Sequence, residues 1–311
     1  MKYEFTIFGS GISAKITSYL LASEGYKVCL ILDKEKNQGT PSTNLVTFLS
    51  KGSLNYLYSK FPKMSSLFAK YSDIEAINCQ LISVNKNKSE SIYFEDDKKE
   101  TLGKIVKNIE LEDILNEYIN QSVNLSIINS NPLSLIENTT DGVTLTLQNS
   151  DHIYSDLFIL SSSQANITKQ LKIKFINKDL EQHALSIDVK GNIKNKFSAF
   201  QKFTSDGPLA LLPYSDDEAS VVWSLRNNSQ ILQKDNDELA KIISNHLIEH
   251  VASLQLINIE KHRLQFTFAK NLFYKNTVLI GNIAHNIHPI AGQGLNLTIK
   301  DIAEFMNQIS K

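Results

Sequence analysis

Hydrophobic residues near the start of the chain predict a strand, a helix and a second strand. The run Tyr3–Phe8 is apolar and short, as in a buried strand. From Ile12 onward apolar residues recur at helical spacing, and this pattern ends near Gly25. A second apolar run, Val28–Leu32, follows directly. This order is the start of a βαβ unit and indicates an α/β fold.

Alternating apolar and polar positions dominate the middle of the chain. Val143–Leu147 and Ile153–Leu160 alternate on either side of a short polar turn, so we expect a β-hairpin. From Leu180 the pattern indicates an antiparallel sheet. Its predicted strands are Ala184–Val189, Phe197–Phe203, Pro208–Pro213 and Ala219–Leu225.

In the last quarter of the chain, apolar residues show helical spacing in some segments and the short runs of strands in others. The pattern predicts a helix over Glu238–Ile257 and a strand over Arg263–Lys270. The apolar run Val278–Ile280 reads as a buried strand that stops at Gly281, and a loop containing Pro289 and two glycines follows. Helical spacing then begins after the second of these glycines. It is carried by Leu295, Ile299, Ile302, Phe305, Met306 and Ile309.

The turn after the first predicted strand has the spacing of a dinucleotide-binding loop, G-x-G-x-x-A. Gly9 would make the tight turn, Gly11 would let a pyrophosphate approach the backbone, and Ala14 would let the helix pack on the strand. Asp33 ends the second strand and could accept hydrogen bonds from a ribose. The alternative is a tight turn in a sheet that binds no ligand.

A second group of motifs stands near the C-terminus, as Gly281-Asn282, Ala284-His285, His288-Pro289 and Ala291–Asn296. This run resembles the second flavin-binding motif of the aromatic-ring hydroxylases with FAD, and among them the ring hydroxylases of ubiquinone biosynthesis (the UbiH type). That family has an Asp where this chain has Asn282.

Three further segments support the resemblance. Phe48–Ser53 and Leu102–Asn108 resemble family segments that each open a helix, and Gly207–Pro213, followed by Val221-Val222-Trp223, resembles the substrate-domain signature. A simpler interpretation of Trp223 and the nearby phenylalanines is that they form a core.

The chain also departs from the family pattern. Leu45 stands near the place of an Arg, and Lys107 replaces a Glu. The largest departure is Leu160–Ser163, where the family has Gly-Ala-Asp-Gly, a motif that serves FAD and NAD(P)H together. A serine loop there is either a harmless replacement or an alternative donor set, since hydroxyls can also bond phosphate or ribose.

The resemblance implies a fold like that of p-hydroxybenzoate hydroxylase. This is a three-layer, Rossmann-like FAD-binding domain with an inserted antiparallel-sheet substrate domain. We expect residues 1–70, 98–178 and 265–311 to form the FAD-binding domain, and residues 71–97 and 179–264 the substrate domain.

The resemblance also implies the site. FAD would be the cofactor and NAD(P)H the reductant. His288, Pro289 and Gly292 would form a catalytic loop facing the flavin ring. The predicted cofactor-binding residues are Gly9, Gly11, Ala14, Asp33, Gly281, Asn282, Pro289, Gly292, Gln293, Gly294, Leu295 and Asn296. The substrate would be a prenylated phenol or quinone precursor, so peripheral contact with a membrane is expected, as is contact with subunits of a ubiquinone-biosynthesis complex.

Composition and charge exclude several other classes. A net charge of −1 gives no electrostatic case for nucleic acid. Cys29 and Cys79 lie in apolar stretches and are expected to be two buried thiols of a reducing compartment. We see no signal peptide and no apolar run of the roughly 20 residues that a membrane span needs, so we expect a cytoplasmic protein, peripheral at the inner membrane. No acidic or cysteine cluster accompanies His285 and His288, so we expect no metal.

Two functions of different classes stay open. One is an FAD-dependent monooxygenase that hydroxylates an aromatic ring of a ubiquinone precursor. The other is a catalytically impaired flavin-fold homologue that acts as a binding or scaffold subunit of a ubiquinone-biosynthesis assembly. Asn282, Leu45 and the serine loop favour the second, whereas the intact Pro289–Asn296 loop favours the first. A nicotinamide-dependent dehydrogenase would leave the C-terminal motif unexplained.

Overall fold

The structure is a computed structural model that describes residues 1–33, 45–82, 89–98, 100–130, 133–162, 165–287 and 293–309. The chain divides into two compact units. Unit 1 comprises residues 1–41, 109–178 and 265–311, and unit 2 comprises residues 42–108 and 179–264. Each unit is therefore built from segments that are far apart in the sequence.

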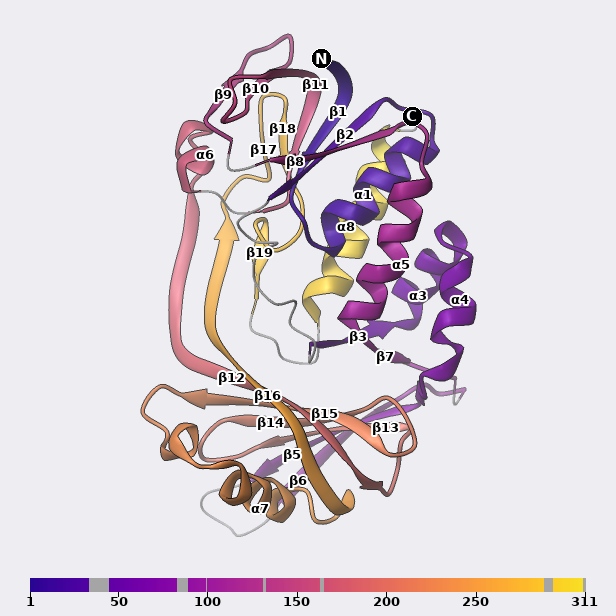
Figure 1. Cartoon of the computed structure of the whole chain (residues 1–311). Helices are drawn as coiled ribbons and strands as arrows, with labels where there is room; N and C mark the ends of the chain where they lie inside the picture. The colour runs from indigo at the N-terminus through magenta and orange to yellow at the C-terminus, as the bar shows by residue number, and fades with distance from the viewer. Residues whose placement is uncertain are drawn as a thin grey trace. The chain divides into compact units, whose positions relative to one another are not determined.

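Unit 1 is built on a sheet with the strand order β17-β18-β11-β1-β2-β8, and β10 and β9 pair beside β11 (Figure 1). Strands β11, β1, β2 and β8 pair with one another in parallel and β18 runs parallel to β11, whereas β10 is antiparallel to β11. The strands are β1 (Lys2–Phe8), β2 (Val28–Asp33), β8 (Leu125–Ser130), β9 (Leu135–Asn138), β10 (Val143–Thr146), β11 (His152–Leu160), β17 (Phe273–Tyr274) and β18 (Thr277–Leu279).

Helices α1 (Ile12–Ser23), α5 (Asn108–Gln121) and α8 (Gln293–Ile309) lie together on one side of this sheet (Figure 1). The Lys15 ammonium of α1 lies 3.0 Å from the Glu112 carboxylate of α5, and α1 also packs against α8. A buried cluster of the sheet that includes Phe8, Ile31 and Leu160 also contains Ile136 of β9 and Leu145 of β10. The short helix α6 (Ala165–Gln170) packs near β9. This arrangement leaves the C-terminal ends of the parallel strands next to the start of α1.

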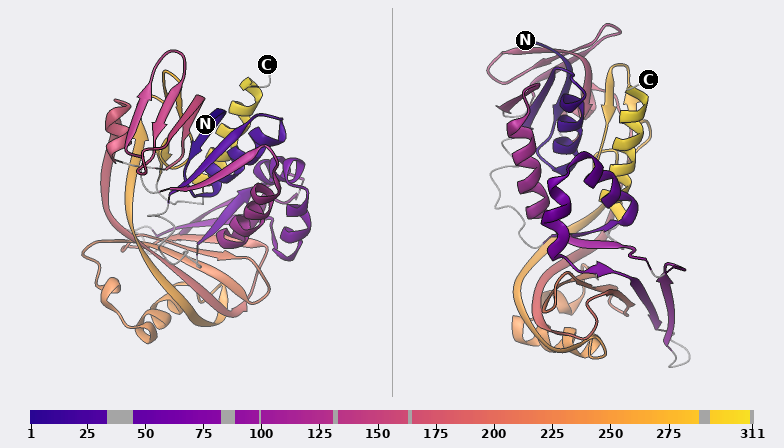
Figure 2. Two further views of the ribbon diagram at one scale, coloured as in Figure 1. Left: turned by 45° about the horizontal axis from the view of Figure 1, so that its top comes forward. Right: turned by 90° about the vertical axis from the view of Figure 1, so that its right-hand side faces the viewer.

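Unit 2 contains a mainly antiparallel sheet, in the order β16-β12-β15-β14-β13-β5-β6. Its strands are β5 (Ala76–Ile82), β6 (Ser89–Glu95), β12 (Phe175–Ile193), β13 (Ser198–Phe203), β14 (Pro208–Pro213), β15 (Glu218–Arg226) and β16 (Val251–Ala269). Strands β12 and β16 are 19 residues long and are neighbours in the sheet, and each has residues in both units (Figure 2). In unit 1, the end of β16 pairs with β19 (His285–Asn286).

One face of the unit 2 sheet is covered by α7 (Asn236–His246), which is preceded by the short 3-10 helix η2 (Gln230–Gln233). Leu239 and Ile243 of α7 join Trp223, Val221 and Leu211 of the sheet in one buried cluster. Trp223 is fully buried in this cluster, so the interpretation of this residue as core is confirmed.

A small three-stranded sheet, β3-β7-β4, also belongs to unit 2. It consists of β3 (Val46–Ser50), β7 (Gly103–Lys107) and β4 (Asp73–Ile74), and α3 (Lys51–Lys60), α4 (Lys63–Leu67) and the 3-10 helix η1 (Phe68–Lys70) accompany it. Ser50 caps α3, because its Oγ accepts a hydrogen bond from the Ser53 amide at 3.3 Å. The two segments expected to open helices do so, at Lys51 and at Asn108.

The predicted helix Glu238–Ile257 is wrong beyond its first half. Helix α7 ends at His246, and Val251 begins β16. Leu247 is fully buried and closes the apolar face of α7, whereas Leu254 and Leu256 alternate with exposed neighbours. Alternation of this kind fits pairing with β12 rather than a helix. The strand expected at Arg263–Lys270 is the second half of the same β16.

Two smaller findings concern the cysteines and the surface. Both cysteines are free. Cys29 is buried, and burial raises the pKa of its thiol to about 12. Cys79 is only half-buried, so the expectation of two buried thiols is wrong for Cys79.

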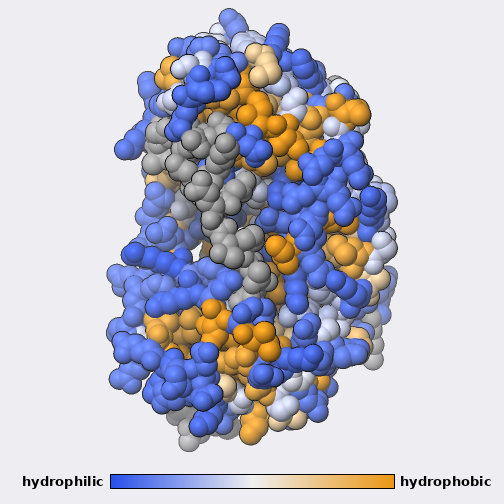
Figure 3. All heavy atoms as spheres, in the orientation of Figure 1, coloured by the Kyte–Doolittle hydropathy of each residue, from blue (hydrophilic) through white to orange (hydrophobic). Residues whose placement is uncertain are grey.

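Figure 3 shows hydrophobic groups set among hydrophilic ones on the face it presents. Among the described helices, none has the length and hydropathy to span a membrane, and the described residues include no His/Cys/Asp/Glu group able to hold a metal.

Candidate functional site

Four parallel strands of unit 1 end side by side. Phe8 of β1 pairs with Ile31 of β2 and with Leu160 of β11, and Leu160 pairs in turn with Leu279 of β18. In open α/β sheets, ligands bind outside the C-terminal ends of such strands. The loops that begin at Gly9, Ser161 and Ile280 therefore form the candidate site, and the residues that follow Asp33 lie outside the described part of the chain.

Gly9 makes the turn that leaves β1. Its amide donates to the Ile31 carbonyl at 3.0 Å, while the Ser161 amide donates to the Phe8 carbonyl at 2.9 Å. A Cβ atom on Gly9 would lie 3.2 Å from Cβ of Ser161 and 3.4 Å from Cβ of Ala14, and φ is +151°. The crowding explains why a glycine stands at the turn and a small residue at position 14.

The start of α1 is open to a ligand. Helix α1 begins at Ile12, with Gly11 as its N-cap; no side chain caps it and its first turn holds no acidic residue. A Cβ atom on Gly11 would meet no other atom within 4 Å. Helix N-termini attract anions through free N–H groups and the helix dipole. The open space beside Gly11 and the absence of a capping side chain in this turn fit the pyrophosphate of FAD.

Asp33 at the end of β2 is held by the first glycine loop. The Asp33 amide donates to Ser10 Oγ at 2.9 Å, and Ser10 Oγ lies 3.4 Å from the Asp33 carbonyl oxygen. Only 2% of Asp33 is exposed. The predicted site does not include Ser10, although its position between two glycines of a nucleotide-binding loop is a signal for such a role.

Three loops meet at a pair of serines. Ser13 Oγ and Ser161 Oγ are 2.7 Å apart, and either can be the donor. Gly281 has φ +86°, and a Cβ atom there would lie 2.5 Å from Ser13 Oγ and 3.3 Å from Ser161 Oγ. The serine loop after β11 is thus packed into the junction of both predicted flavin motifs. Ser162 beside it is buried, and its Oγ has no hydrogen-bond partner within the described residues.

The second motif turns at Gly281 and is attached to α8. The Gly281 carbonyl accepts from the Ala284 amide at 2.9 Å, and His285 Nε2 lies 2.5 Å from Asp301 Oδ2 of α8. His285 is buried whereas Asn282 is exposed, so Asn282 is accessible to a ligand. Nothing in the sequence pattern links His285 to Asp301, which lies 16 residues further along the chain.

The rest of the predicted C-terminal site is described in part. His288, Pro289 and Gly292 lie outside the described residues. Helix α8 begins at Gln293 and so includes Gly294, which had been expected in the loop. A Cβ atom on Gly294 would meet no atom within 4 Å. Gln293 is exposed, Leu295 is half-buried and Asn296 is buried.

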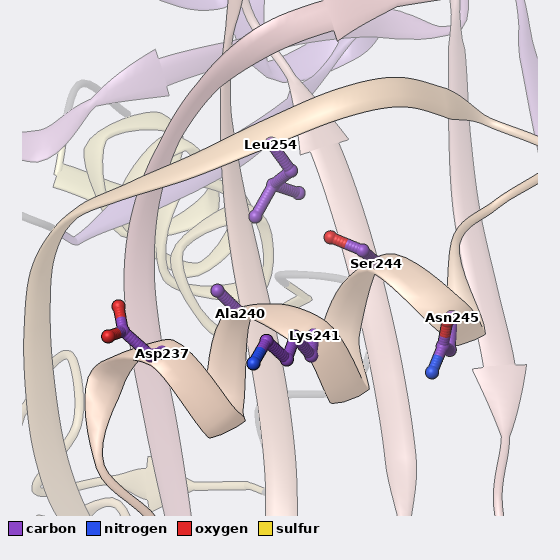
Figure 4. A pocket seen from close by; sticks show the side chains of 6 residues that line it. All are labelled: Asp237, Ala240, Lys241, Ser244, Asn245 and Leu254. Carbon is purple, nitrogen blue, oxygen red and sulfur yellow. The ribbon is translucent and has the colours of Figure 1, made fainter.

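A hollow of unit 2 lies apart from these motifs. Figure 4 shows the side chains that line it, which come from α7 and from β16. They are Asp237, Ala240, Lys241, Ser244, Asn245 and Leu254. None of the residues that the sequence motifs identify lines this hollow.

Comparisons with known proteins agree with the geometry. The model of the family described as "FAD binding domain" matches residues 160–311. Residues 160–311 of this chain are thus similar to the FAD-binding domain family. The cofactor expected from the sequence motifs is therefore confirmed.

Curated relatives match shorter segments. The 3-demethoxyubiquinol 3-hydroxylase of Escherichia coli is 34% identical over 108 residues, which are 34% of this chain and 27% of the relative. The mitochondrial ubiquinone biosynthesis monooxygenase COQ6 of Danio rerio is 30% identical over 149 residues, 36% of this chain and 31% of the relative. The match thus spans about a third of each of these relatives. The resemblance to the ring hydroxylases of ubiquinone biosynthesis is confirmed.

Solved structures share the fold over nearly the whole chain. PqsL of Pseudomonas aeruginosa in complex with 2-aminobenzoylacetate has a TM-score of 0.78 at 14% identity, covering 99% of this chain and 86% of that one. The p-nitrophenol 4-monooxygenase PnpA of Pseudomonas putida has a TM-score of 0.75 at 11% identity, covering 98% and 79%. The fold class predicted from the sequence, an FAD-binding α/β domain with an antiparallel-sheet domain, is confirmed.

Proposed function

We propose that this protein is an FAD-dependent monooxygenase that hydroxylates an aromatic ring of a ubiquinone precursor, with NAD(P)H as reductant and O₂ as the second substrate. The observation that carries the proposal is the junction of the two flavin motifs at Gly9, Ser161 and Gly281, next to the open start of α1. The names of the curated relatives support the substrate class.

In this proposal FAD supplies the redox and oxygen chemistry, and the protein binds and orients it. Gly11 and the first amides of α1 hold the pyrophosphate, and Asp33 holds the ribose. By the resemblance, Asn282 would face the ribityl chain, and His288, Pro289 and Gly292, which lie outside the described residues, would contact the flavin ring.

We assign roles to the segments as the sequence motifs indicate. Residues 1–70, 98–178 and 265–311 bind the cofactor, and residues 71–97 and 179–264 bind the substrate. The division by compactness differs, because it groups residues 42–108 with residues 179–264. Residues 42–70 and 98–108 therefore lie in unit 2, although their sequence motifs resemble cofactor-domain segments.

A prenylated substrate requires contact with a membrane surface, and the β5–β6 hairpin supports that contact. Ile92 and Phe94 of β6 are 49% and 52% exposed. They lie opposite Cys79 and Ile77 of β5, so all four side chains share one face of the hairpin. We assign this hairpin face to the bilayer surface or to the prenyl tail entering from it.

The test of the proposed function is product formation from a short-chain prenylated phenol. The full-length protein, reconstituted with FAD, is mixed with NADPH, the phenol and isotopically labelled O₂. The expected result is one labelled oxygen atom in the ring product, detected by mass spectrometry. NADPH oxidation that yields only hydrogen peroxide, or no NADPH oxidation at all, contradicts the proposal.

A second candidate function rests on the departures from the family pattern. Asn282 replaces an acidic residue, and Ser162 and Ser163 replace the residues that couple FAD to NAD(P)H in the family motif. A flavin-fold subunit that binds FAD weakly and serves as a scaffold in a ubiquinone-biosynthesis assembly fits these changes. Anaerobic mixing with NADPH separates the two, since slow or absent bleaching of bound FAD supports the scaffold and fast bleaching supports the enzyme.

A further inference from the structure

The unit 2 sheet has a second face, opposite to the one that α7 covers. Ile187 and Val221 belong to the core cluster that includes α7. Their neighbours Asp188 and Ser220 point to the other face, because successive side chains in a strand alternate. Asp188 of β12 and Ser220 of β15 are direct cross-strand partners, so their side chains are adjacent on that face.

Both side chains end in a buried polar atom that lacks a partner. Asp188 Oδ1 and Ser220 Oγ have almost no solvent contact and no hydrogen-bond partner among the described residues. Ser220 as a whole is fully buried. Buried polar atoms are nearly always hydrogen-bonded, and an unpaired one is unfavourable. Two such atoms at neighbouring register positions leave two hydrogen-bond partners unaccounted for among the described residues.

The charges around Asp188 restrict what that ligand is. Burial raises the pKa of the Asp188 carboxyl; the Lys107 ammonium lowers it, and Glu218 and Glu260 raise it. Lys107 is itself engaged, because its Nζ lies 3.7 Å from Glu218 Oε2 and 4.8 Å from the centre of the Tyr214 ring. The site therefore has three carboxylates, those of Asp188, Glu218 and Glu260, and one ammonium, that of Lys107. This excess of negative charge disfavours an anionic ligand.

We propose that Asp188 and Ser220 bind a hydroxyl group carried by the neutral aromatic ring of the substrate. A carboxylate only accepts hydrogen bonds, whereas a serine hydroxyl donates and accepts. A ring hydroxyl can donate to Asp188 and accept from Ser220 at once. A methoxy group cannot donate, so it leaves the carboxylate unpaired. The identity of the ring in this assignment rests on the proposed function. Asp188 and Ser220 would then select substrates whose ring carries a hydroxyl group.

The test compares two ring compounds that differ in one group, 2-methoxyphenol and 1,2-dimethoxybenzene. Binding to the full-length protein is measured by ligand-observed NMR or calorimetry, with and without FAD. We expect the parent protein to bind the phenol at least tenfold more tightly. In Ser220→Ala and Asp188→Asn this preference should fall below threefold. Asp216→Asn, a change at an exposed carboxylate, should keep the full preference.

Several outcomes decide the inference. An equal affinity of the parent for both compounds, or an unchanged preference in Ser220→Ala, overturns it and leaves an internal water as the partner of the two atoms. Ser220→Ala removes an unpaired hydroxyl and should fold normally, so it decides the matter even if Asp188→Asn does not fold. FAD titration of the same variants should match the parent. A parent that binds no FAD but prefers the phenol refutes the proposed function and supports the hydroxyl site.

Discussion

At the scale of single residues, the glycines and serines of the strand-end loops determine the candidate site. The glycine roles could be predicted, because turn geometry and phosphate approach require a missing side chain at fixed spacing. The contact between Ser13 and Ser161 could not, since the two residues are 148 positions apart and nothing local pairs them. The same holds for Asp188 and Ser220, whose adjacency depends on strand register.

Gly281→Ala should destabilise the protein. The added methyl group would lie 2.5 Å from Ser13 Oγ, and φ of +86° is unfavourable for any other residue. We expect the free energy of unfolding to fall by roughly 1–3 kcal/mol in urea denaturation. Gly11→Ala is the matched control, since its Cβ meets no atom, and it should cost less than about 1 kcal/mol. Equal losses in both variants would mean that the junction at Gly281 is not tight.

Asn282→Asp should strengthen FAD binding about fivefold. A hydrogen bond to a charged group contributes about 1.5–3 kcal/mol, against about 0.5–1.5 kcal/mol for a neutral one. The difference of about 1 kcal/mol corresponds to roughly a fivefold change in Kd. Because Asn282 is exposed, the carboxylate meets no large burial penalty. The measurement is FAD titration by fluorescence quenching. Equal or weaker binding by the Asp variant would show that position 282 does not face the ribityl chain.

At the scale of secondary-structure elements, the local pattern of apolar residues predicts most of the strands and helices of unit 1. It fails in unit 2, at the end of helix α7. The β1-α1-β2 order and the β10–β11 hairpin follow directly from period and turn residues. The helix predicted to continue past His246 is wrong there, because the few apolar residues of this segment fit both helical and strand spacing. Only pairing with β12, which is distant in sequence, makes Val251–Ala269 one long strand.

The hydrogen bond between His285 and the Asp301 carboxylate should attach the second flavin motif to α8. His285 is buried and its partner lies at 2.5 Å. A double-mutant cycle with His285→Ala and Asp301→Ala should give a coupling of about 1.5–3 kcal/mol in stability, the range for a charge-assisted hydrogen bond. Glu304→Ala, at an exposed position of α8, should show no coupling to His285. A coupling near zero for Asp301 would mean that the pair does not hold the loop.

The β5–β6 hairpin should direct the protein to lipid. Ile92→Ser combined with Phe94→Ser removes two exposed apolar side chains from one hairpin face. We expect binding to phospholipid vesicles to fall at least tenfold in co-sedimentation. The control is Ile248→Ser, which removes an exposed apolar residue elsewhere in unit 2 and should bind like the parent. Unchanged binding of the double variant would remove the hairpin from the membrane contact.

At the scale of the whole molecule, the chain combines an FAD-binding α/β unit with an antiparallel-sheet unit through two 19-residue strands. The resemblance of its motifs gave this fold class in advance. The functional division of the chain stays a prediction, and compactness groups residues 42–108 with residues 179–264 because it depends on which segments pack together, which motif spacing does not report. Asn282 and the serine loop after β11 depart from the family sequence, yet the backbone turns around them keep the glycine geometry.

The most direct test of this account is FAD titration of the purified protein, followed by visible absorption and by fluorescence quenching. We predict one FAD per chain, with the absorption bands of a bound oxidised flavin. Gly11→Val places a branched side chain in the open space beside the start of α1, and it should weaken binding at least tenfold without lowering Tm by more than a few degrees. A parent protein that binds no FAD, or a Gly11→Val variant that binds it as tightly as the parent, would contradict the account.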